Sequence, residues 1–335
     1  MATVVLAHAS LEDAAIELAV FAEAGGIEAI SVSDLDSPEG RAAVASCDAL
    51  MVALQPVRAD LIATMRNCKI ISRLGVGYDA IDYETAAAHG IWVANVPDYG
   101  VDEVSSHALA LLMALERNLK EHFQIVDGGS WRYAQATHPI RRLKGQTLGV
   151  LGYGRIGNAM GDKGKGIGFR VIAHDPWLTD EQIRERGAEP VDFATLLRES
   201  DAISLHVPLS DQTRHIINAE ALAQMKPTAF IINTARGEVV DIDALVEAVR
   251  NGVIAGAGID VLPVEPPPPD LPILHEPRIV VTPHIAWASN EARAEMRRRG
   301  AEDVVRVLRG ERPRTPVNEV GSVLGRENPA LEVPG

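Results

Sequence analysis

A glycine-rich segment in the middle of the chain limits the fold more than any other feature. It begins directly after the apolar run Thr147–Leu151 and follows the spacing Gly-x-Gly-x-x-Gly. Glycine allows a tight turn, lets the backbone approach a pyrophosphate, and lets a helix pack closely on the preceding strand. The segment therefore predicts a strand, a turn and a helix that bind a dinucleotide through Gly152, Gly154, Arg155, Ile156 and Gly157.

An acidic residue at the expected distance supports this interpretation. The spacing alone is weak evidence because the chain contains 28 glycines, but Asp175 follows Gly157 by 18 residues and comes directly after the run Arg170–His174. Its carboxylate can accept hydrogen bonds from the adenosine ribose hydroxyls, and its charge would repel a 2′-phosphate. The predicted cofactor is therefore NAD rather than NADP.

Short runs rich in apolar and β-branched residues alternate with helical patterns along the whole chain. Strands separated by helices form right-handed βαβ units and parallel sheets. A chain of 335 residues with 47% hydrophobic residues can bury two cores. We therefore expect an α/β protein with two parallel-sheet domains. The predicted strands are 3–7, 49–53, 69–72, 91–94, 147–151, 171–173, 202–206, 230–233 and 254–259.

Composition argues against several classes of protein. The formal charge of −14 and the isoelectric point of about 5.2 oppose a general polyanion-binding surface, so no nucleic-acid partner is expected. Cys47 and Cys68 lack CxxC spacing and a histidine-rich neighbourhood, so neither a disulfide framework nor a metal site is predicted. The chain begins with a strand-like run rather than a secretory signal, and its longest apolar helical stretch, 109–115, is far too short to span a membrane. These features predict a cytoplasmic protein without a membrane partner.

Three ionisable residues in the second half of the chain suit one reaction. Arg236 and His284 follow apolar runs, and Glu265 lies in a proline-rich loop. Open α/β sheets bind ligands at the carboxyl ends of their strands. A guanidinium offers two parallel donors to a carboxylate, and an imidazole, with an ordinary pKa of about 6.5, can exchange a proton with an alcohol oxygen. Singly they could be a structural salt bridge, a structural histidine and a solvated glutamate, but together they suit hydride transfer on a hydroxy acid.

The surrounding sequence resembles a known enzyme family. Four segments occur in the order typical of D-isomer-specific 2-hydroxyacid dehydrogenases, and the similarity covers residues 49–318. The segments are Leu148–Gly157 (LGVLGYGRIG), Asn233–Gly237 (NTARG), Gly258–Val261 (GIDV) followed by Glu265-Pro266, and Thr282–Trp287 (TPHIAW). Within the family, His284–Trp287, Arg73–Asp79 (RLGVGYD) and Asn95–Pro97 are most similar to the branch that includes the C-terminal-binding-protein corepressors.

The resemblance implies a role for particular residues. Those implied in catalysis are Arg236, Glu265 and His284. Those implied in cofactor binding, besides the glycine segment and Asp175, are His206, Val207, Pro208, Thr213, Thr234, Ala235, Asp260 and His284. Those implied in substrate binding are Arg73, Val76, Gly77, Arg236, His284 and Trp287. Backbone N–H groups of the Val76-Gly77 turn can bind a carboxylate.

The resemblance also implies how the chain is divided. Residues 1–101 with 290–335 would form a discontinuous, flavodoxin-like substrate-binding domain, and residues 102–289 a Rossmann-like NAD-binding domain. The active site would lie in the cleft between them, and the NAD-binding domains would pair in a homodimer.

Helical patterns add three local expectations. One helix is predicted over 102–120, capped by Asp102, and another over 289–308. Four glycines, Gly161, Gly164, Gly166 and Gly168, crowd the helix after the glycine turn. An interior glycine costs about 1 kcal/mol relative to alanine, so this helix should be short or unusually close to its neighbours. Residues 321–335 are expected to form a tail.

The main hypothesis is an NAD-dependent dehydrogenase that interconverts a small D-2-hydroxy acid and its 2-keto acid, with substrates of the glyoxylate, hydroxypyruvate or phosphoglycerate type. One alternative is an NAD(H)-gated interaction protein, because the corepressors resemble the enzymes at the same positions. Another is a dehydrogenase of the same fold that acts on phosphite or a phosphonate. Formate is disfavoured, because formate dehydrogenases resemble this layout with a glutamine in place of Glu265. The sequence leaves the substrate and the preferred direction open.

Overall fold

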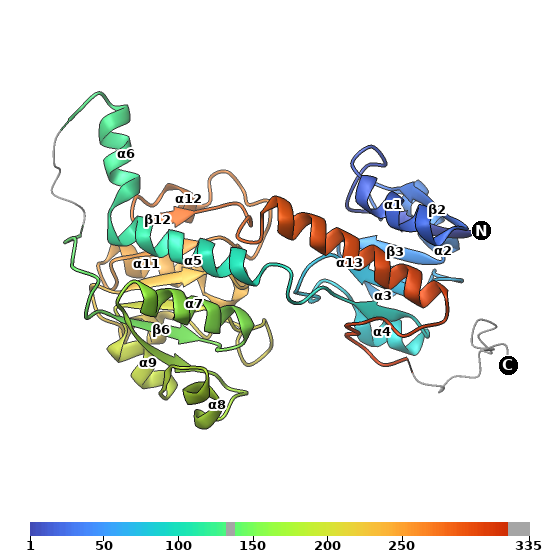
Figure 1. Cartoon of the computed structure of the whole chain (residues 1–335). Helices are drawn as coiled ribbons and strands as arrows, with labels where there is room; N and C mark the ends of the chain where they lie inside the picture. Colours follow the sequence, from blue (N-terminus) through green and yellow to red (C-terminus); the bar gives the residue numbers. More distant parts are fainter. Residues whose placement is uncertain (132–137, 321–335) are drawn as a thin grey trace. The chain divides into compact units, whose positions relative to one another are not determined.

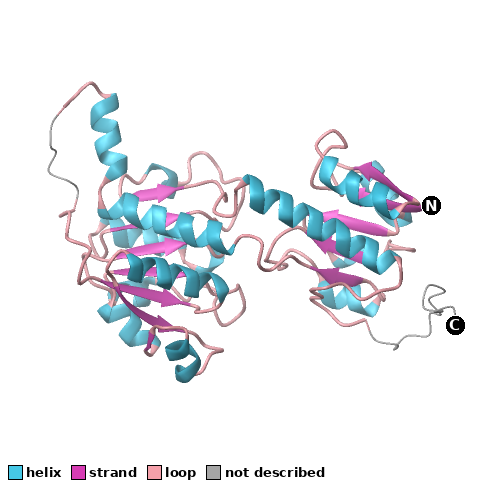
Figure 2. Ribbon diagram, in the orientation of Figure 1, coloured by secondary structure: helices cyan, strands magenta, loops and turns pink. Residues whose placement is uncertain are grey.

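The computed structural model describes residues 1–131 and 138–320, and the chain divides into two compact units (Figure 1, Figure 2). Unit 1 comprises Met1–Tyr99 and the chain from Ser289 onward, and unit 2 is Gly100–Ala288. The first division between the units falls after residue 99, two residues before the expected one, and the second falls after residue 288, one residue before the expected one. The expected tail, 321–335, lies outside the described residues. None of the helices in the described ranges is both long and apolar enough to cross a membrane.

Unit 1 is built around a five-stranded parallel sheet in the order β2-β1-β3-β4-β5. Its strands are β1 (Ala2–Leu6), β2 (Ile27–Ser31), β3 (Ala49–Val52), β4 (Ile70–Arg73) and β5 (Trp92–Ala94). The helices between them are α1 (Ala15–Ala24), α2 (Pro38–Ser46), α3 (Ala59–Ile62) and α4 (Tyr83–Ala88). The central strand β3 is buried along its whole length, as expected for an unbroken apolar run in a parallel sheet with helices on both faces.

The chain re-enters unit 1 as the long helix α13 (Asn290–Leu308). Ser289 caps this helix by accepting a hydrogen bond from the N–H of Ala292 at 2.9 Å, which confirms the helix predicted over 289–308. The helix packs on β3, β4 and α1. Beyond it, the side chain of Asn318 accepts a hydrogen bond from the N–H of Val93 at 2.8 Å, so the C-terminal segment is held against the sheet.

Unit 2 contains a seven-stranded parallel sheet in the order β12-β11-β10-β9-β6-β7-β8. Its strands are β6 (Thr147–Leu151), β7 (Arg170–His174), β8 (Glu189–Pro190), β9 (Ala202–Leu205), β10 (Phe230–Asn233), β11 (Gly256–Ile259) and β12 (Ile279–Val281). The chain runs outward from β6 to β8 and then returns to the other side of β6 at β9. Open α/β sheets bind ligands at such a reversal, at the carboxyl ends of the strands. The predicted α/β fold with two parallel sheets is therefore confirmed.

Helices cover both faces of this sheet. On one face, α5 (Val101–Glu116) lies beside α7 (Arg155–Gly166) (Figure 1). The opposite face packs against the helices that follow β8, β9 and β10, which are α9 (Phe193–Glu199), α10 (Ala219–Ala223) and α11 (Ile242–Arg250). Two further short helices, α8 (Asp180–Glu185) and α12 (Pro272–His275), pack beside β8 and β12.

The glycines of α7 serve close packing. The helix is 12 residues long, so the expectation of a short helix is wrong. A Cβ atom on Gly161 would lie 2.5 Å from the Tyr153 hydroxyl, and one on Gly164 would lie 2.5 Å from Cδ2 of Leu148. The alternative expectation, a helix unusually close to its neighbours, is confirmed.

The helix expected over 102–120 is interrupted. α5 ends at Glu116, and Asn118 adopts a left-handed φ of 50° before α6 (Leu119–Asp127) begins. Asparagine tolerates this conformation better than most residues. The continuous apolar pattern is therefore divided between two helices.

The predicted cap of α5 is also wrong. Gly100 occupies the N-cap position, two residues earlier than the expected Asp102. Asp102 lies in the first turn and forms a 2.7 Å ion pair with Lys163 of α7, so its carboxylate joins two helices.

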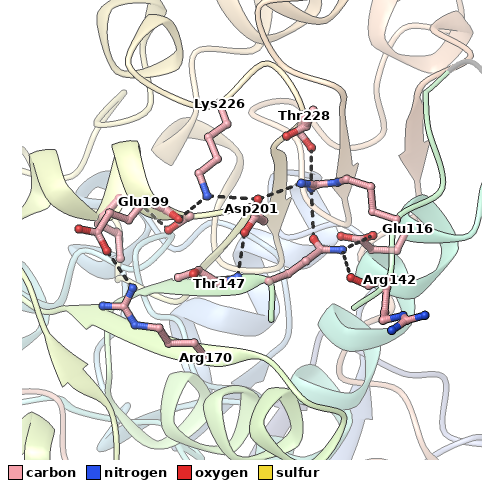
Figure 3. Close-up of polar contacts among 12 residues, drawn as sticks. Glu116, Arg142, Thr147, Arg170, Glu199, Asp201, Lys226 and Thr228 are labelled. Carbon is pink, nitrogen blue, oxygen red and sulfur yellow. Dashed lines mark hydrogen bonds and ion pairs between the residues drawn. The ribbon is translucent and has the colours of Figure 1, made fainter. Parts of the chain in front are cut away.

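A charged cluster lies at the amino-terminal edge of the large sheet (Figure 3). Asp201 is buried there, and it accepts hydrogen bonds from the N–H of Thr147 at 2.9 Å and from Nη1 of Arg141 at 3.0 Å. Lys226 Nζ lies 3.2 Å from the same carboxylate. Burial opposes ionisation, but these donors outweigh it and hold the pKa of Asp201 below its ordinary value. The cluster ties β6 to β9 and to the segment before β10.

Asp201→Asn is expected to lower the free energy of unfolding at pH 7 by about 1–3 kcal/mol, because buried donors lose their charged acceptor. In the wild type, the pKa of Asp201 is lower in the folded than in the unfolded protein. The stability that its ionised carboxylate contributes is therefore fully present above the ordinary carboxyl pKa of about 4 and is lost as the pH falls through the pKa of the folded state. Urea unfolding of both proteins at pH 7 and in steps toward about pH 3 measures the two effects.

A control lies in the same cluster. Glu199 pairs with Arg170 at 3.0 Å, but both side chains are about half exposed, so Glu199→Gln should change stability little. Equal losses for the two substitutions, or a loss for Asp201→Asn that does not vary with pH, would contradict the prediction.

Candidate active site

The glycine turn after β6 leaves room for a ligand. A Cβ atom on Gly152 would lie 2.7 Å from the carbonyl carbon of His206, and one on Gly157 would lie 2.0 Å from the carbonyl oxygen of Gly152. Packing of the protein itself therefore requires these two glycines. A Cβ atom on Gly154 would meet no described atom within 4 Å. Packing does not require glycine at that position, and the open space suits the close approach of a bound group.

The amino terminus of α7 can bind an anion at the same turn. Gly154 is the N-cap, and none of the described side chains caps the helix. Arg155 is exposed at the first helical position, and Ile156 follows it. A helix amino terminus with unpaired N–H groups attracts negative charge. The turn therefore fits the pyrophosphate of a dinucleotide.

Asp175 lies beside this turn, directly after β7. Its Oδ2 accepts a hydrogen bond from the N–H of Tyr153 at 2.6 Å, and its Oδ1 accepts one from the N–H of Trp177 at 2.8 Å. A cavity of about 340 Å³ opens at this position and is also lined by Asp180 and Asp192. Three carboxylates around one cavity suit ribose hydroxyls and would repel a phosphate.

The loop after β9 runs past the glycine turn, and its first residue, His206, is neutral. Desolvation lowers the pKa of His206 to about 3, and its Nε2 lies 2.8 Å from the hydroxyl of Ser204. Val207 is buried, whereas Pro208 is exposed. The Thr213 hydroxyl donates to the carbonyl of Pro208 at 2.6 Å. Thr213 therefore closes this loop on itself.

Asn233, the last residue of β10, orders the next loop. Its Nδ2 donates to the carbonyl of Arg236 at 2.8 Å, and its Oδ1 accepts from the N–H of Ala235 at 3.0 Å. The hydroxyl of Thr234 is buried without a hydrogen-bond partner among the described residues. An unsatisfied buried hydroxyl is costly, so this position fits a polar group of a bound cofactor.

The loop that carries Arg236 approaches the loop that carries Glu265. Gly237 allows the approach, because a Cβ atom there would lie 2.1 Å from the carbonyl carbon of Leu262. The Arg236 guanidinium donates to the carbonyl of Ala235 at 2.7 Å. Its charge is also one of the causes that lower the pKa of Glu265, so the two side chains interact electrostatically.

Glu265 and His284 form the central pair of the site. Nδ1 of His284 lies 2.6 Å from Oε2 of Glu265, and the N–H of Leu262 donates to Oε1 at 2.8 Å. Burial disfavours the charged carboxylate, but these hydrogen bonds and the charge of Arg236 outweigh it and lower the pKa of Glu265. An ionised Glu265 accepts from the Nδ1–H group, which leaves Nε2 of His284 available to exchange a proton.

The backbone turn at His284 has an unusual conformation and is held by several hydrogen bonds. His284 has a left-handed φ of 53°, a conformation uncommon for residues other than glycine. The carbonyl of Asp260 accepts from the N–H of His284 at 2.8 Å, and the Asp260 carboxylate accepts from the N–H groups of Ile285 at 3.0 Å and Ala286 at 2.9 Å. Trp287 Nε1 donates to the carbonyl of His284 at 3.1 Å. Asp260 and Trp287 therefore hold the turn that presents the imidazole.

The candidate residues of unit 1 follow β4. The carbonyl of Gly75 accepts from the N–H of Val96 at 3.0 Å, and that of Val76 accepts from Nδ2 of Asn95 at 2.6 Å. In a trans peptide the N–H group points away from the preceding carbonyl. The N–H groups of Val76 and Gly77 therefore face away from the loop after β5, where they can bind a carboxylate.

The predicted residues gather at two sheet edges. In unit 2 they lie at the carboxyl ends of strands β6, β7 and β9 to β12, and in unit 1 Arg73, Val76 and Gly77 lie at the carboxyl end of β4. Sequence reasoning missed two positions, Asn233 and His107. A polar side chain that ends a buried strand could have indicated Asn233. Nothing in the local pattern links His107 to Thr282, whose hydroxyl it contacts at 2.9 Å.

Comparisons with known proteins identify one family. The family model described as "D-isomer specific 2-hydroxyacid dehydrogenase, NAD binding domain" matches residues 109–286. A glyoxylate reductase of Korarchaeum cryptofilum is 42% identical over 82% of this chain and 84% of its own. A glycerate dehydrogenase of Methylorubrum extorquens is 39% identical over 72% of this chain and 76% of its own. A crystal structure of D-lactate dehydrogenase from Aquifex aeolicus, complexed with NAD and lactic acid, has a TM-score of 0.85 at 28% identity and covers 95% of this chain and 99% of that one.

These comparisons decide the family and leave the branch open. Similarity to the corepressor branch stays a prediction, because these three relatives are named as dehydrogenases and reductases. The family model spans more than half of the chain, and the identity to a curated relative extends over most of it. The chain therefore belongs to the NAD-dependent D-isomer-specific 2-hydroxyacid dehydrogenases.

Proposed function

We propose that this enzyme reduces a small 2-keto acid, such as glyoxylate or hydroxypyruvate, with NADH and oxidises the corresponding D-2-hydroxy acid in the reverse direction. The Glu265–His284 pair is the main support, because it offers a proton donor held by a carboxylate at 2.6 Å. Similarity to a glyoxylate reductase and a glycerate dehydrogenase supports a small substrate. The comparisons do not favour an interaction protein or a phosphite or phosphonate dehydrogenase.

In the proposed reaction, three side chains have separate tasks. The Arg236 guanidinium binds the substrate carboxylate through two parallel donors, which orients the planar keto acid. Nε2 of His284 donates a proton to the keto oxygen as that oxygen becomes an alcohol, and it accepts the proton in the reverse reaction. Glu265, whose pKa is lowered, remains ionised at neutral pH and stabilises the imidazolium. NADH supplies the hydride.

The remaining candidate residues bind and orient. We assign the pyrophosphate of NAD to the glycine turn and the amino terminus of α7, and the adenosine ribose to Asp175. The Thr234 hydroxyl and the Val207-Pro208 segment are assigned to the nicotinamide half. Arg73 and the N–H groups of Val76 and Gly77 are assigned to the substrate carboxylate. A cytoplasmic location stays a prediction.

We further propose that two copies of the chain associate through unit 2. α6 extends away from the sheet of this unit (Figure 1). On α6 and just after it, the side chains of Phe123, Val126 and Trp131 are 62%, 52% and 93% exposed. Large apolar side chains gathered on one segment are typical of a protein interface.

The wild type should catalyse NADH oxidation with at least one of glyoxylate, hydroxypyruvate and pyruvate. His284→Ala should lower kcat by about 10²–10⁴-fold because the proton donor is lost, while NADH binding, measured by fluorescence, should change little. His275→Ala is a matched control, because that histidine is exposed and its ring contacts the nearby carbonyl of Pro269 at 2.8 Å. A wild type that binds NADH but reduces none of these acids, bulkier 2-keto acids or phosphonates would favour the interaction-protein hypothesis.

Glu265→Gln should move the alkaline limb of the pH profile for keto-acid reduction to lower pH. The imidazolium of His284 loses its negative neighbour and releases its proton more easily, so the active protonated form is lost sooner as the pH rises. The profile of kcat/KM against pH measures this shift. Glu189→Gln, which alters an exposed pair with Arg170 at 2.7 Å, should leave the profile unchanged. Identical profiles for wild type and Glu265→Gln would remove Glu265 from the mechanism.

Light scattering after size-exclusion chromatography should give twice the chain mass of 35.9 kDa for the wild type. The double substitution Phe123→Ser and Val126→Ser should produce monomers, because it removes apolar surface from the proposed interface. Leu11→Ser, at an exposed apolar position of unit 1, should leave the mass unchanged. A monomeric wild type would contradict the proposed dimer.

A further inference from the structure

His107 on α5 contacts the segment that presents His284. Its Nε2 lies 2.9 Å from the hydroxyl of Thr282, directly after β12, and 3.5 Å from Oδ1 of Asp260. The helix packs on β11 and β12, which brings a residue from early in unit 2 to the end of its last strand. The His107 side chain is 21% exposed and that of Asp260 is 1% exposed, so the contact lies in a largely dry environment.

The chemistry of these groups determines which one donates in the hydrogen bond between His107 and Thr282. The Thr282 hydroxyl lies 2.5 Å from Oδ1 of Asp260, and it has one hydrogen to donate. A carboxylate can only accept, so that hydrogen is directed at Asp260. The Thr282 oxygen must then accept from the Nε2–H group of His107. His107, Thr282 and Asp260 form a single chain of donors that ends at the carboxylate.

The Asp260 carboxylate, where this series of hydrogen bonds ends, holds the backbone at His284. The Asp260 carboxylate receives the Thr282 hydroxyl and the N–H groups of Ile285 and Ala286. These bonds hold the turn in which His284 keeps its left-handed φ of 53°. Such a conformation persists only where surrounding contacts determine it. A change in the orientation of Asp260 therefore alters the placement of the imidazole relative to Glu265.

We propose that His107 is a positioning residue for the reaction, which acts through Thr282 and Asp260 to hold the His284 imidazole against Glu265. The inference rests on the proposed acid/base role of His284. The competing interpretation is a histidine that only packs α5 on the sheet. The two differ, because a positioning residue affects turnover through its hydrogen-bond donor, whereas a packing residue acts through its volume.

Substitutions of His107 separate donor from volume. His107→Phe keeps a planar ring of similar size without the donor, and His107→Gln keeps an N–H donor near the Nε2 position. Misplacement of a reacting group costs up to about 10²-fold in rate, so we expect His107→Phe to lower kcat about tenfold or more. KM for the keto acid and the affinity for NADH should change less than about twofold, and His107→Gln should recover most of the turnover.

A double-mutant cycle tests whether the residues act in one chain. Thr282→Val removes the intermediate hydroxyl and should lower kcat to a similar extent. The combination with His107→Phe should be no slower than Thr282→Val alone, because the donor chain is already broken. His89→Phe is the control and should keep wild-type turnover, because this histidine of unit 1 follows α4 and its ring contacts the carbonyl of Thr85 in that helix at 2.9 Å.

A measurement without substrate separates this inference from the proposed function. In the protein labelled with ¹⁵N-histidine, the Nδ1–H proton of His284 should give a low-field resonance, because Nδ1 lies 2.6 Å from Oε2 of Glu265. We expect it to move or broaden in His107→Phe and to return in His107→Gln. Wild-type kcat in His107→Phe, multiplicative effects in the cycle, or an unchanged His284 resonance would each overturn the positioning role. A wild type without turnover on any keto acid would overturn the proposed function, and the resonance would still decide the role of His107.

Discussion

All strands of unit 2 run in the same direction, and this constraint determines where the candidate site can form. In a parallel sheet every strand ends at the same edge, so the loops after β6, β9, β10 and β12 meet although they are far apart in the sequence. The close approach of Gly152 to the backbone of His206 marks the point where the strand order reverses. The common direction of the strands brings these loops together, and the side chains of the site can meet only because the loops do.

The parts of the fold that local chemistry determines could be predicted. The run Thr147–Leu151 and the glycines after it predict β6, the turn and α7, because steric needs at these positions are local. Strand β2 does not stand out, because none of its residues is fully buried, Glu28 interrupts its short apolar run and Ser31 ends that run. The break between α5 and α6 depends on the left-handed backbone of Asn118, and an apolar periodicity contains no information about one residue's φ angle.

The site shows the same division between local and distant determinants. The residue types of Arg236 and His284 indicate their chemistry, and resemblance to the family adds Glu265, but no spacing in the sequence predicts a 2.6 Å contact between Glu265 and His284. His107 is 175 positions from Thr282, and only the packing of α5 on the sheet brings the two together. Contacts of this kind depend on tertiary structure, so a helical pattern identifies His107 merely as a histidine on a helix.

Asp260 and Glu265 are close in sequence and both contact the segment around His284, yet their surroundings give them different tasks. The Asp260 carboxylate receives three donors from Thr282, Ile285 and Ala286, so its hydrogen-bonding capacity serves the backbone turn. Glu265 receives one backbone N–H group and the imidazole itself. A carboxylate occupied by backbone donors fixes geometry, whereas one whose main partner is an ionisable ring responds to that ring's charge. The separation allows the turn to stay rigid while the proton on His284 is gained and lost.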